Sequence, residues 1–355
     1  MNKIISFFLC TLPVLIVFLT TLPSHSASTE FPDTRIGGYM QLYGLYQHQE
    51  DIQPTEENWG YRLRRARLTA QSSITDRLSA SAWLEFAGRQ NILLDFHFDY
   101  RVYRGIRIRG GQFRPFGQSF NTGILGSASV LFPERSAITP FNASQMGYDA
   151  FRDIGAMMYG SVGSLSYAFQ ATNGSGRFTH AGSQITSRSL AGGAYGGRLD
   201  YSPTPEFLIG GHLATNQQRN VVRDGAGPFD VNRHSASLRL QTQELLNPSG
   251  FTRSEFIIGS RDDTQEFNYD GLYVETGVNL TEPWSLLGRF DYLAQRYADD
   301  RSDDVQFGYS LGVLRYIFLN NREVIRTGIH YNLTDLSDDR LQHTVTAVFQ
   351  VRFLP

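Results

Sequence analysis

The chain has 355 residues, of which 41% are hydrophobic and 13% aromatic, and its formal net charge is −2. This aromatic content with so small a net charge excludes a disordered chain, and the near balance of charges argues against a general nucleic-acid binder. Cys10 is the only cysteine, which excludes a disulfide scaffold, and Lys3 is the only lysine, so 31 of the 32 basic residues are arginines.

The N-terminus is typical of a secretory signal peptide. Lys3 provides a positive start, residues 4–19 are mostly apolar, and small residues follow as far as Ala27. We therefore predict a signal peptide over residues 1–27, cleaved near Ala27, and one mature domain over residues 28–355. An uncleaved membrane anchor is the alternative.

After the signal peptide, apolar and polar side chains alternate in many segments. Leu94, Phe96 and Phe98, for example, alternate with Asp95 and Asp99. A period of two places successive side chains on opposite faces of a β-strand. No apolar run in this part of the chain approaches the roughly 18 residues that a spanning helix requires. The pattern therefore predicts amphipathic strands.

Sixteen strands are predicted in chain order. They span residues 35–48, 60–74, 77–88, 91–103, 106–114, 151–162, 164–173, 194–202, 206–215, 233–243, 252–261, 271–281, 284–296, 305–318, 323–333 and 340–353. Most of them are about 10 to 14 residues long, whereas strands of soluble sheets most often have roughly 5–6 residues.

The connections alternate between short turns and long polar loops. Short turns are predicted at 75–76, 104–105, 163, 202–205, 282–283 and 320–321, and long loops near 50–58, 115–150, 174–193 and 216–232, with shorter loops near 262–270, 297–304 and 334–339. Short turns on one rim, long loops on the other and aromatic residues near the strand ends are typical of an outer-membrane barrel. The strands must close on themselves, because a bilayer has no water to satisfy an open sheet edge.

These features predict an all-β, antiparallel transmembrane barrel of about 16 strands in a Gram-negative outer membrane. An even strand number places both termini and the short turns on the periplasmic side. A barrel of this size encloses a water-filled channel. Its surroundings would be outer-membrane lipid and lipopolysaccharide.

The acidic stretch 299–304 is interpreted as a solvated loop, or alternatively as a site for divalent cations between lipopolysaccharide phosphates.

The polar faces of the strands would line the channel, and arginines outnumber carboxylates there. The predicted lining residues include Asp99, Arg107, Arg109, Arg289 and Asp291. A cationic wall of low dielectric constant favours anions, and a guanidinium binds oxyanions through two parallel hydrogen bonds. The alternative is that mixed arginine and aspartate rows only solvate the wall of a non-selective pore.

The second predicted strand carries Arg62, Arg64, Arg65 and Arg67 within six residues. Strict alternation cannot direct all four side chains into the channel. We expect Arg65 and Arg67 to face inward. Arg62 and Arg64 would then sit at the barrel rim or extend their charged ends toward the membrane–water boundary.

Four stretches resemble the phosphate-selective porin O and P family of Gram-negative outer membranes. They are YRLRRARL at 61–68, RGGQFRPFG at 109–117, PERS at 133–136 and RDIGAMMYG at 152–160. The resemblance implies a sixteen-stranded, trimeric channel whose third loop folds into the lumen. It also implies uptake of anions or phosphate along arginines.

The stretch 115–150 is the third external loop and the longest. Its apolar residues indicate that it packs against another part of the molecule, and in porins the third loop sets the constriction. The residues expected at or near the narrowest level are Glu134, Arg135, Arg152 and Asp153, with Arg107 and Arg109 opposite or adjacent. Alternatively, Glu134 and Arg135 pair with each other or with the barrel wall and only hold the loop in place.

The sequence therefore predicts a passive channel for small anionic solutes, phosphate and related oxyanions among them, with no cofactor. A general, weakly selective diffusion porin is the nearest alternative, and a structural or adhesive barrel is a third. An enzyme is disfavoured, because the eight histidines include no pair at metal-binding spacing and no nucleophile-elbow motif occurs. His97 beside Asp99 is interpreted as an ordinary lumen-lining pair.

Overall fold

The computed structural model describes residues 32–50, 56–88, 93–115, 131–148, 151–176, 193–221, 229–243, 250–263, 266–299, 302–319, 322–336 and 340–353. The predicted signal peptide lies outside these residues, as does the first part of the predicted third loop, 116–130. In the described part of the chain, no helix is long and apolar enough to cross a membrane.

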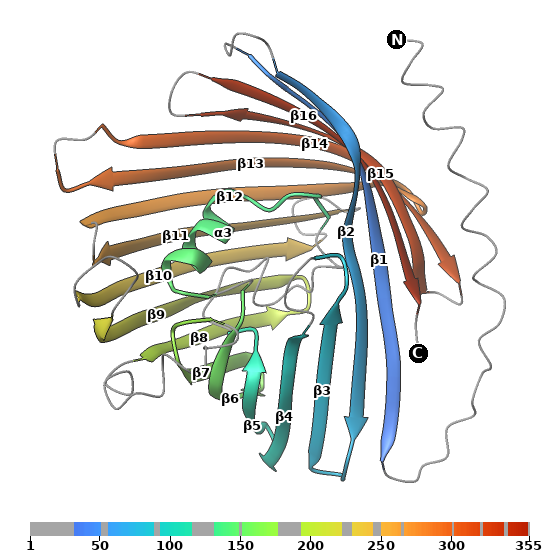
Figure 1. Ribbon diagram of the computed structural model, residues 1–355. Coiled ribbons are helices and arrows are strands. Elements are labelled where there is room, and N and C mark those ends of the chain that lie inside the picture. The colour runs from blue at the N-terminus through green and yellow to red at the C-terminus, as the bar shows by residue number, and fades with distance from the viewer. Residues whose placement is uncertain are drawn as a thin grey trace.

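The described strands form one closed antiparallel barrel (Figure 1). Each strand pairs with its neighbours in sequence, and β1 pairs with β16. The predicted closed barrel of 16 strands is thereby confirmed. The strands are β1 (Asp33–Gln49), β2 (Glu56–Ser73), β3 (Leu78–Glu85), β4 (Leu93–Tyr103), β5 (Ile106–Phe113), β6 (Asp153–Val162), β7 (Leu165–Thr172), β8 (Gly193–Thr204), β9 (Phe207–Val221), β10 (Phe229–Gln243), β11 (Gly250–Asp262), β12 (Glu266–Thr281), β13 (Trp284–Tyr297), β14 (Asp304–Leu319), β15 (Arg322–Asp335) and β16 (Leu341–Phe353).

Side chains along each strand point alternately outward and inward. On β10, Leu238 and Leu240 are exposed on the outer surface, whereas Arg239 between them is buried on the inner surface. Phe256 and Ile258 on β11 face outward in the same way around buried Ile257. The barrel is therefore apolar outside and polar inside, which is the arrangement that a surrounding bilayer requires.

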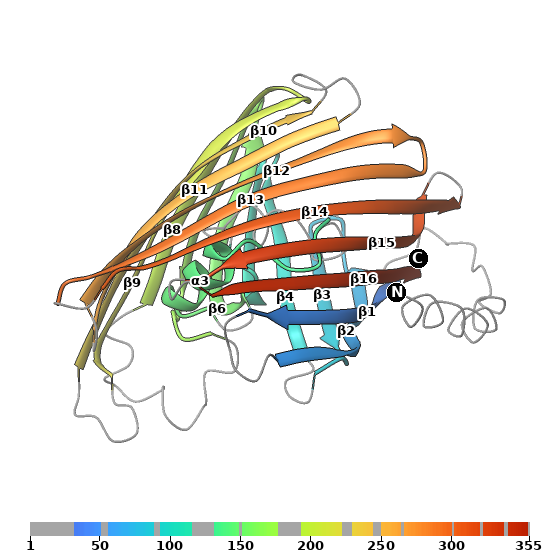
Figure 2. The same ribbon diagram turned by 90° about the horizontal axis from the view of Figure 1, so that it is seen from above.

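The barrel wall is uneven in height. β3, β5 and β7 have 8 residues each, whereas β9, β10, β12 and β14 have 15 or 16. A spanning strand needs roughly 9–11 residues, so the long strands extend beyond the bilayer. Figure 2 shows β10 to β14 as a continuous wall of long strands.

Two of the long strands continue through segments predicted as loops. β9 includes residues 216–221 and β12 includes residues 266–270. In β9, Asn216 and Gln217 still pair in register with Arg233 and Asn232 of β10. Residues 216–221 of β9 show no apolar–polar alternation, because neither face needs to be apolar outside the bilayer. Residues 266–270 of β12 do alternate, but their apolar residues Phe267 and Tyr269 are buried on the inner face.

The short turns lie together at one end of the barrel. Gly105, between β4 and β5, has a φ of 82°, a left-handed conformation that favours glycine. A Cβ atom at Gly105 would also lie 2.7 Å from the carbonyl oxygen of Ser161. The tight turn and its contact with the end of β6 therefore both depend on this glycine.

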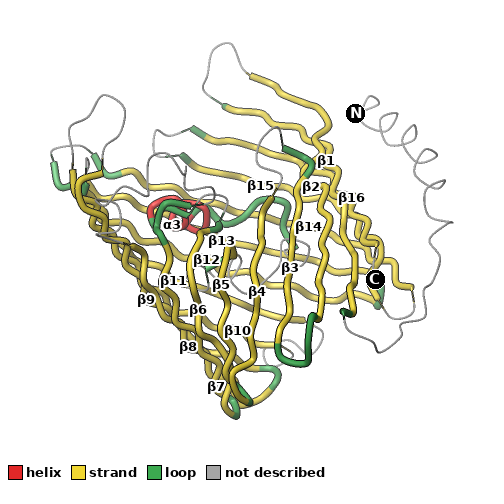
Figure 3. The backbone as a smooth tube through the Cα atoms, turned by 60° about the horizontal axis from the view of Figure 1, so that its bottom comes forward, coloured by secondary structure: helices red, strands yellow, loops and turns green. Residues whose placement is uncertain are grey.

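The third loop contains a helix that the sequence pattern did not indicate. α3 (Ile138–Gln145) contacts β11, β12 and β13, and it is the red helix of Figure 3. Ile138 packs with Ile257, Tyr273 and Leu293, all of which are buried. Gly271 leaves room for it, since a Cβ atom there would lie 2.6 Å from the Cβ of Ile138. The loop prediction for 138–145 is therefore wrong, because these tertiary contacts stabilise a helix without local amphipathic periodicity.

Candidate functional site: the arginine-rich inner wall

A β-bulge in β2 changes which of its arginines face inward. Arg65 pairs in register with Gln41, but the next register pair is Leu42 with Leu63, so Arg64 is the extra residue. The extra residue shifts the inward–outward alternation of β2 by one position. Arg62 therefore lies on the same inner face as Arg65 and Arg67. The expectation that Arg62 and Arg64 leave the inner face is therefore wrong.

Arg65 and Arg67 share one carboxylate. Nη1 of Arg65 and Nε of Arg67 donate to Oε2 of Glu85 at 3.3 and 2.7 Å. The backbone N–H of Ala66 donates to Oε1 of Glu85 at 2.8 Å. The Arg67 side chain is only 1% exposed. This pairing neutralises part of the positive charge of β2.

Glu134 in the third loop contacts two separate parts of the inner wall. Its carboxylate accepts a hydrogen bond from Arg62 of β2 at 3.0 Å and lies 4.0 Å from Arg64. Its backbone carbonyl accepts a 2.6 Å hydrogen bond from Nη1 of Arg289 on β13. Asp291 of β13 accepts a 3.0 Å hydrogen bond from the N–H of Ala137. Arg289 and Asp291, predicted as lining residues, thus hold the loop.

Arg135 lies against the wall beside the β2 arginines. Its guanidinium is 4.2 Å from the centre of the Phe151 ring, and it lines a small cavity of about 20 Å³ together with Arg64 and Arg65. Burial lowers the pKa of Arg135 well below its usual value, and the neighbouring positive charges, Arg65 first, lower it further. Arg135 therefore adds to a concentration of positive charge where the loop meets β2.

Arg152 and Asp153 are adjacent in sequence but are bound to different parts of the protein. Arg152 donates from Nη2 to Oδ2 of Asp95 at 3.0 Å, and its side chain is 2% exposed. Asp153 accepts hydrogen bonds from the N–H groups of Gly174 and Gly176 at 2.6 and 3.2 Å. Both side chains are thus engaged by protein groups.

Arg109 and Arg107, which were predicted together, have different surroundings. Nε and Nη2 of Arg109 donate to the two carboxylate oxygens of Asp99 at 2.8 and 3.0 Å. The hydroxyl of Tyr159 donates to the same carboxylate at 2.9 Å, and Nε2 of His97 lies 3.4 Å from it. Arg107, by contrast, is exposed on the inner face.

Arg107 belongs to a cluster of arginines at the end of the barrel where the short turns lie. A cavity of about 720 Å³ is lined there by Arg77, Arg101, Arg104, Arg107 and Arg198, with Asp76 as the only carboxylate. Arg101 donates to the backbone carbonyl of Asp76 rather than to its carboxylate. We call this group the mouth cluster. In the described part of the chain, its first four arginines form no ion pair.

Sequence reasoning missed two members of the mouth cluster, Arg77 and Arg104. Both lie in short turns, next in space to the inward-facing strand ends that carry Arg101 and Arg107. Arg104 falls in the predicted turn 104–105, whereas Arg77 is the first residue of the predicted strand 77–88, although β3 begins only at Leu78. The available signal was an arginine in or directly beside each of two successive short turns. Reading only the strand faces overlooked it.

No protein-family model matches the chain, and no curated protein is similar to it in sequence. Among solved structures, the chain is similar to an anion-selective porin from Comamonas acidovorans, with a TM-score of 0.65 and 13% identity over 90% of this chain and 100% of that one. It is also similar to the outer membrane channel DcaP of Acinetobacter baumannii, with a TM-score of 0.65 and 9% identity over 93% and 100% of the chains.

A third similar structure is the trimer form of OmpT, an outer membrane protein of Vibrio cholerae. Its TM-score is 0.63, with 11% identity over 90% of this chain and 99% of that one. Identities this low establish the fold alone, and they agree with the closed barrel and its apolar outer surface. The chain is a Gram-negative outer-membrane β-barrel with the fold of the porins.

Proposed function

We propose that the protein is a passive, water-filled channel for small anionic solutes, with phosphate and related oxyanions as the candidate substrates. The observation that carries this proposal is the mouth cluster, in which Arg77, Arg101, Arg104 and Arg107 surround a cavity without an ion-pair partner among the described residues. The proposal includes no cofactor and no enzymatic activity.

The contrast with the rest of the inner wall supports an anion preference. Arg67, Arg109 and Arg152 each lie within 3.0 Å of a carboxylate oxygen, so the opposite charge largely cancels their field. An unpaired arginine attracts an anion at 4 Å by about 1 kcal/mol in bulk water, and more strongly near a protein wall. Walls of low dielectric constant focus such a field into the channel.

We further propose that the third loop narrows the channel. Support comes from the contacts of Glu134, which joins Arg62 on β2 to Arg289 on β13. A segment fixed in this way would hold Arg135 beside Arg65 at the narrowest level. The roles of Glu134, Arg135, Arg152 and Asp153 at the constriction are part of this proposal.

Membership of the phosphate-selective porin O and P family, cleavage of residues 1–27 and assembly as a homotrimer also belong to the proposal. Support for assembly comes from the low wall at β3, β5 and β7, whose 8 residues fall short of the roughly 9–11 that a spanning strand needs. A neighbouring copy would cover this low wall. Outer-membrane lipid and lipopolysaccharide would surround the remainder.

Single-channel recording under a KCl gradient tests the anion preference. We expect an anion-directed reversal potential, and we expect added phosphate to block the current. In Arg101→Gln/Arg107→Gln the anion-over-cation permeability ratio should fall about fivefold for each charge removed, if each contributes about 1 kcal/mol.

Arg315→Gln is the matched control, because Arg315 lies on the outer surface over the ring of Trp284. It removes the same charge and should leave selectivity unchanged. Unchanged selectivity in the double variant would reduce the protein to a general diffusion porin. No conductance from the folded barrel would favour a structural or adhesive role instead.

A further inference from the structure

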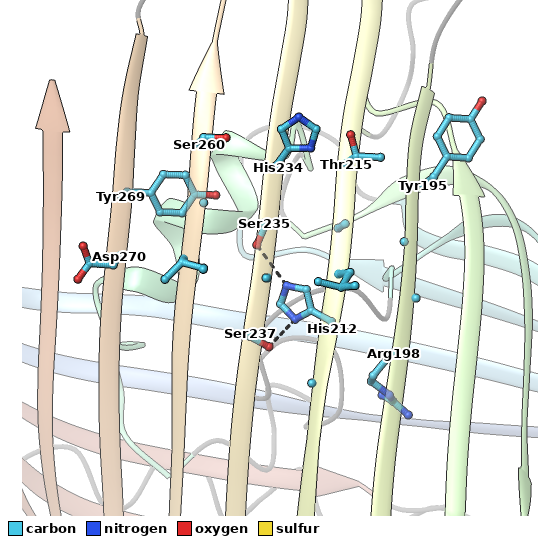
Figure 4. A pocket seen from close by; sticks show the side chains of 18 of the residues that line it. Tyr195, Arg198, His212, Thr215, His234, Ser235, Ser237, Ser260, Tyr269 and Asp270 are labelled. Atoms are coloured by element: carbon cyan, nitrogen blue, oxygen red, sulfur yellow. Dashed lines mark hydrogen bonds between the residues drawn. The ribbon is translucent and has the colours of Figure 1, made fainter. Parts of the chain in front are cut away.

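The outer surface of the barrel carries a groove over β8 to β12, bordered by Phe169 of β7 and Arg296 of β13 (Figure 4). Its volume is about 1240 Å³. The floor lies where the outward residues are small, at Gly197, Gly211 and Ala236. Larger apolar side chains stand around this floor, namely Phe169, Leu199, Leu213 and Ile258, which are 48%, 51%, 71% and 46% exposed.

The wall behind the groove is closed toward the lumen. His212 on the inner face contacts the hydroxyls of Ser235 and Ser237 through its two ring nitrogens, at 3.2 and 2.7 Å. The Ser235 hydroxyl donates in turn to Oδ1 of Asn142 in α3 at 2.7 Å. The groove is therefore a feature of the membrane-facing surface and is separate from the channel.

One edge of the groove is a continuous polar row. Its members are register partners on six neighbouring strands, β8 to β13: Tyr195, Thr215, His234, Ser260, Asn268 and Arg296. Figure 4 shows the first four level with one another. Arg296 forms an ion pair with Asp270 of the next row, and 48% of its side chain remains exposed. Polar side chains are costly within the hydrocarbon, so a continuous polar row on the outer surface is expected at the edge of the hydrocarbon layer.

The strand lengths locate this row in the membrane, given the orientation of the proposed function with the short turns periplasmic. Thr215 is the ninth residue of β9, His234 is the tenth from the end of β10, and Ser260 is the eleventh of β11. A strand crosses the hydrocarbon in roughly 9–11 residues. The row therefore lies at the headgroup level of the outer leaflet, and the apolar floor lies beneath it among the acyl chains.

A groove that is polar at the headgroup level and apolar below is complementary to an amphiphile. The row offers hydroxyl, imidazole, amide and guanidinium donors, which suit phosphate and sugar oxygens. The groove is larger than the roughly 300–1,000 Å³ of common small-molecule pockets, as a ligand with several acyl chains requires. We propose that this groove binds the lipid A part of lipopolysaccharide, with acyl chains over Ala236 and the phosphorylated headgroup on the row from Thr215 to Arg296.

A second copy of the chain is the less suitable occupant. The strands beneath the groove have 12 to 16 residues and span the bilayer without help. Of the low-wall strands, β3 and β5 contribute nothing to the groove, and β7 contributes Phe169 at its border. The chemistry of the groove thus favours lipid.

Native mass spectrometry of the full protein, purified from outer membranes into detergent and titrated with lipid A, tests this assignment. Ala236→Phe fills the floor and should raise the dissociation constant about tenfold by removing acyl-chain contacts. Arg296→Gln should weaken binding through the headgroup. Ala347→Phe is the control, because Ala347 lies between Val345 and Phe349 on the outer face of β16 and should bind lipid A like the wild type.

Three lipid-binding results would overturn the assignment. They are equal lipid A binding by Ala236→Phe and the wild type, an equal loss in Ala347→Phe, and equally tight, Ala236-dependent binding of phosphatidylglycerol. Ala236→Leu replaces Ala236→Phe if the larger side chain prevents folding. A changed oligomer mass in the Ala236 variants would assign the groove to a second copy and also overturn the lipid proposal. Channel selectivity, measured on the same variants, should not change, so a failure here is distinct from a failure of the proposed function.

Discussion

Arginines in this barrel differ in function according to whether a carboxylate lies within reach. Arg152 and Asp95 are both nearly fully buried, and their close pairing makes them part of the wall. Arg107 is exposed on the inner face and has no ion pair among the described residues. The first kind of arginine stabilises the fold, whereas the second leaves a positive field in the channel.

This difference predicts opposite effects of two similar substitutions. Arg152→Ala leaves the buried carboxylate of Asp95 without its main partner, which should lower the free energy of unfolding by about 3–5 kcal/mol. Arg107→Ala should leave stability nearly unchanged and reduce anion selectivity. Urea unfolding followed by heat-modifiable electrophoresis measures the first effect. Equal unfolding midpoints for the two variants would contradict this interpretation.

At the scale of the element, α3 is held by polar contacts at both its middle and its end. Oδ1 of Asn142 accepts hydrogen bonds from Ser235 and from Tyr269, at 2.7 and 2.8 Å. At the helix end, Arg233 donates to the carbonyl of Gln145 at 2.7 Å. Asp263, just after β11, fixes that arginine through a 2.5 Å ion pair. The position of the helix thus depends on a carboxylate outside the strands.

Asp263 predicts an acid-dependent change of the channel. Burial raises the pKa of its carboxyl, but hydrogen bonds from Arg261 and Arg233 outweigh burial and lower the pKa to about 2. A lowered pKa in the folded state means that the stabilisation is complete above the unfolded pKa of about 3.9. It is lost as the pH falls toward 2. We therefore expect conductance to become unstable between these pH values as α3 loosens.

Conductance recorded from pH 5 to pH 2 checks this expectation. Asp263→Asn removes the charge at every pH, so the variant should show the unstable conductance already at pH 7 and little further change on acidification. A variant that retains the pH response of the wild type would exclude Asp263 as its origin.

At the scale of the whole molecule, the wall height divides the outer surface into two regions. The low wall includes β5 with 8 residues, and the tall wall includes β14 with 16. A strand that is too short for the bilayer exposes polar edges to lipid, a cost that a neighbouring copy removes by covering them. The two regions should therefore face a protein copy and lipid, respectively.

Site-specific crosslinking tests this division. Cys10 is the only cysteine and lies in the predicted signal peptide, so a new cysteine would be unique in the mature chain. Ile108→Cys on β5 should be crosslinked between copies by a flexible bismaleimide in outer membranes. Leu311→Cys on β14 should not, although Leu311 is even more exposed, at 63% against 46%. Similar crosslinking at both positions would contradict assembly through the low wall.

The sequence by itself determined the barrel. Alternation in segments such as Leu94 to Asp99 reports directly which face of a strand meets lipid, since the bilayer imposes a local rule on every spanning residue. Sixteen alternating segments and the need to satisfy every backbone hydrogen bond then require closure. The strand ends escaped prediction where β9 and β12 leave the bilayer, because there the apolar residues no longer mark the outer face, as Phe267 and Tyr269 of β12 show by lying buried on the inner one.

Only the tertiary structure decided how the inner charges are arranged. The bulge at Arg64 depends on the pairing of β2 with β1, and α3 depends on contacts that Ile138 makes more than a hundred residues away. Whether an arginine such as Arg109 or Arg107 is neutralised depends on which carboxylate the neighbouring strands bring within 3 or 4 Å. The alternation of apolar and polar residues determines whether a side chain faces lipid or the channel. The electrostatic field inside the channel, however, depends on distances between charged residues that are remote in sequence.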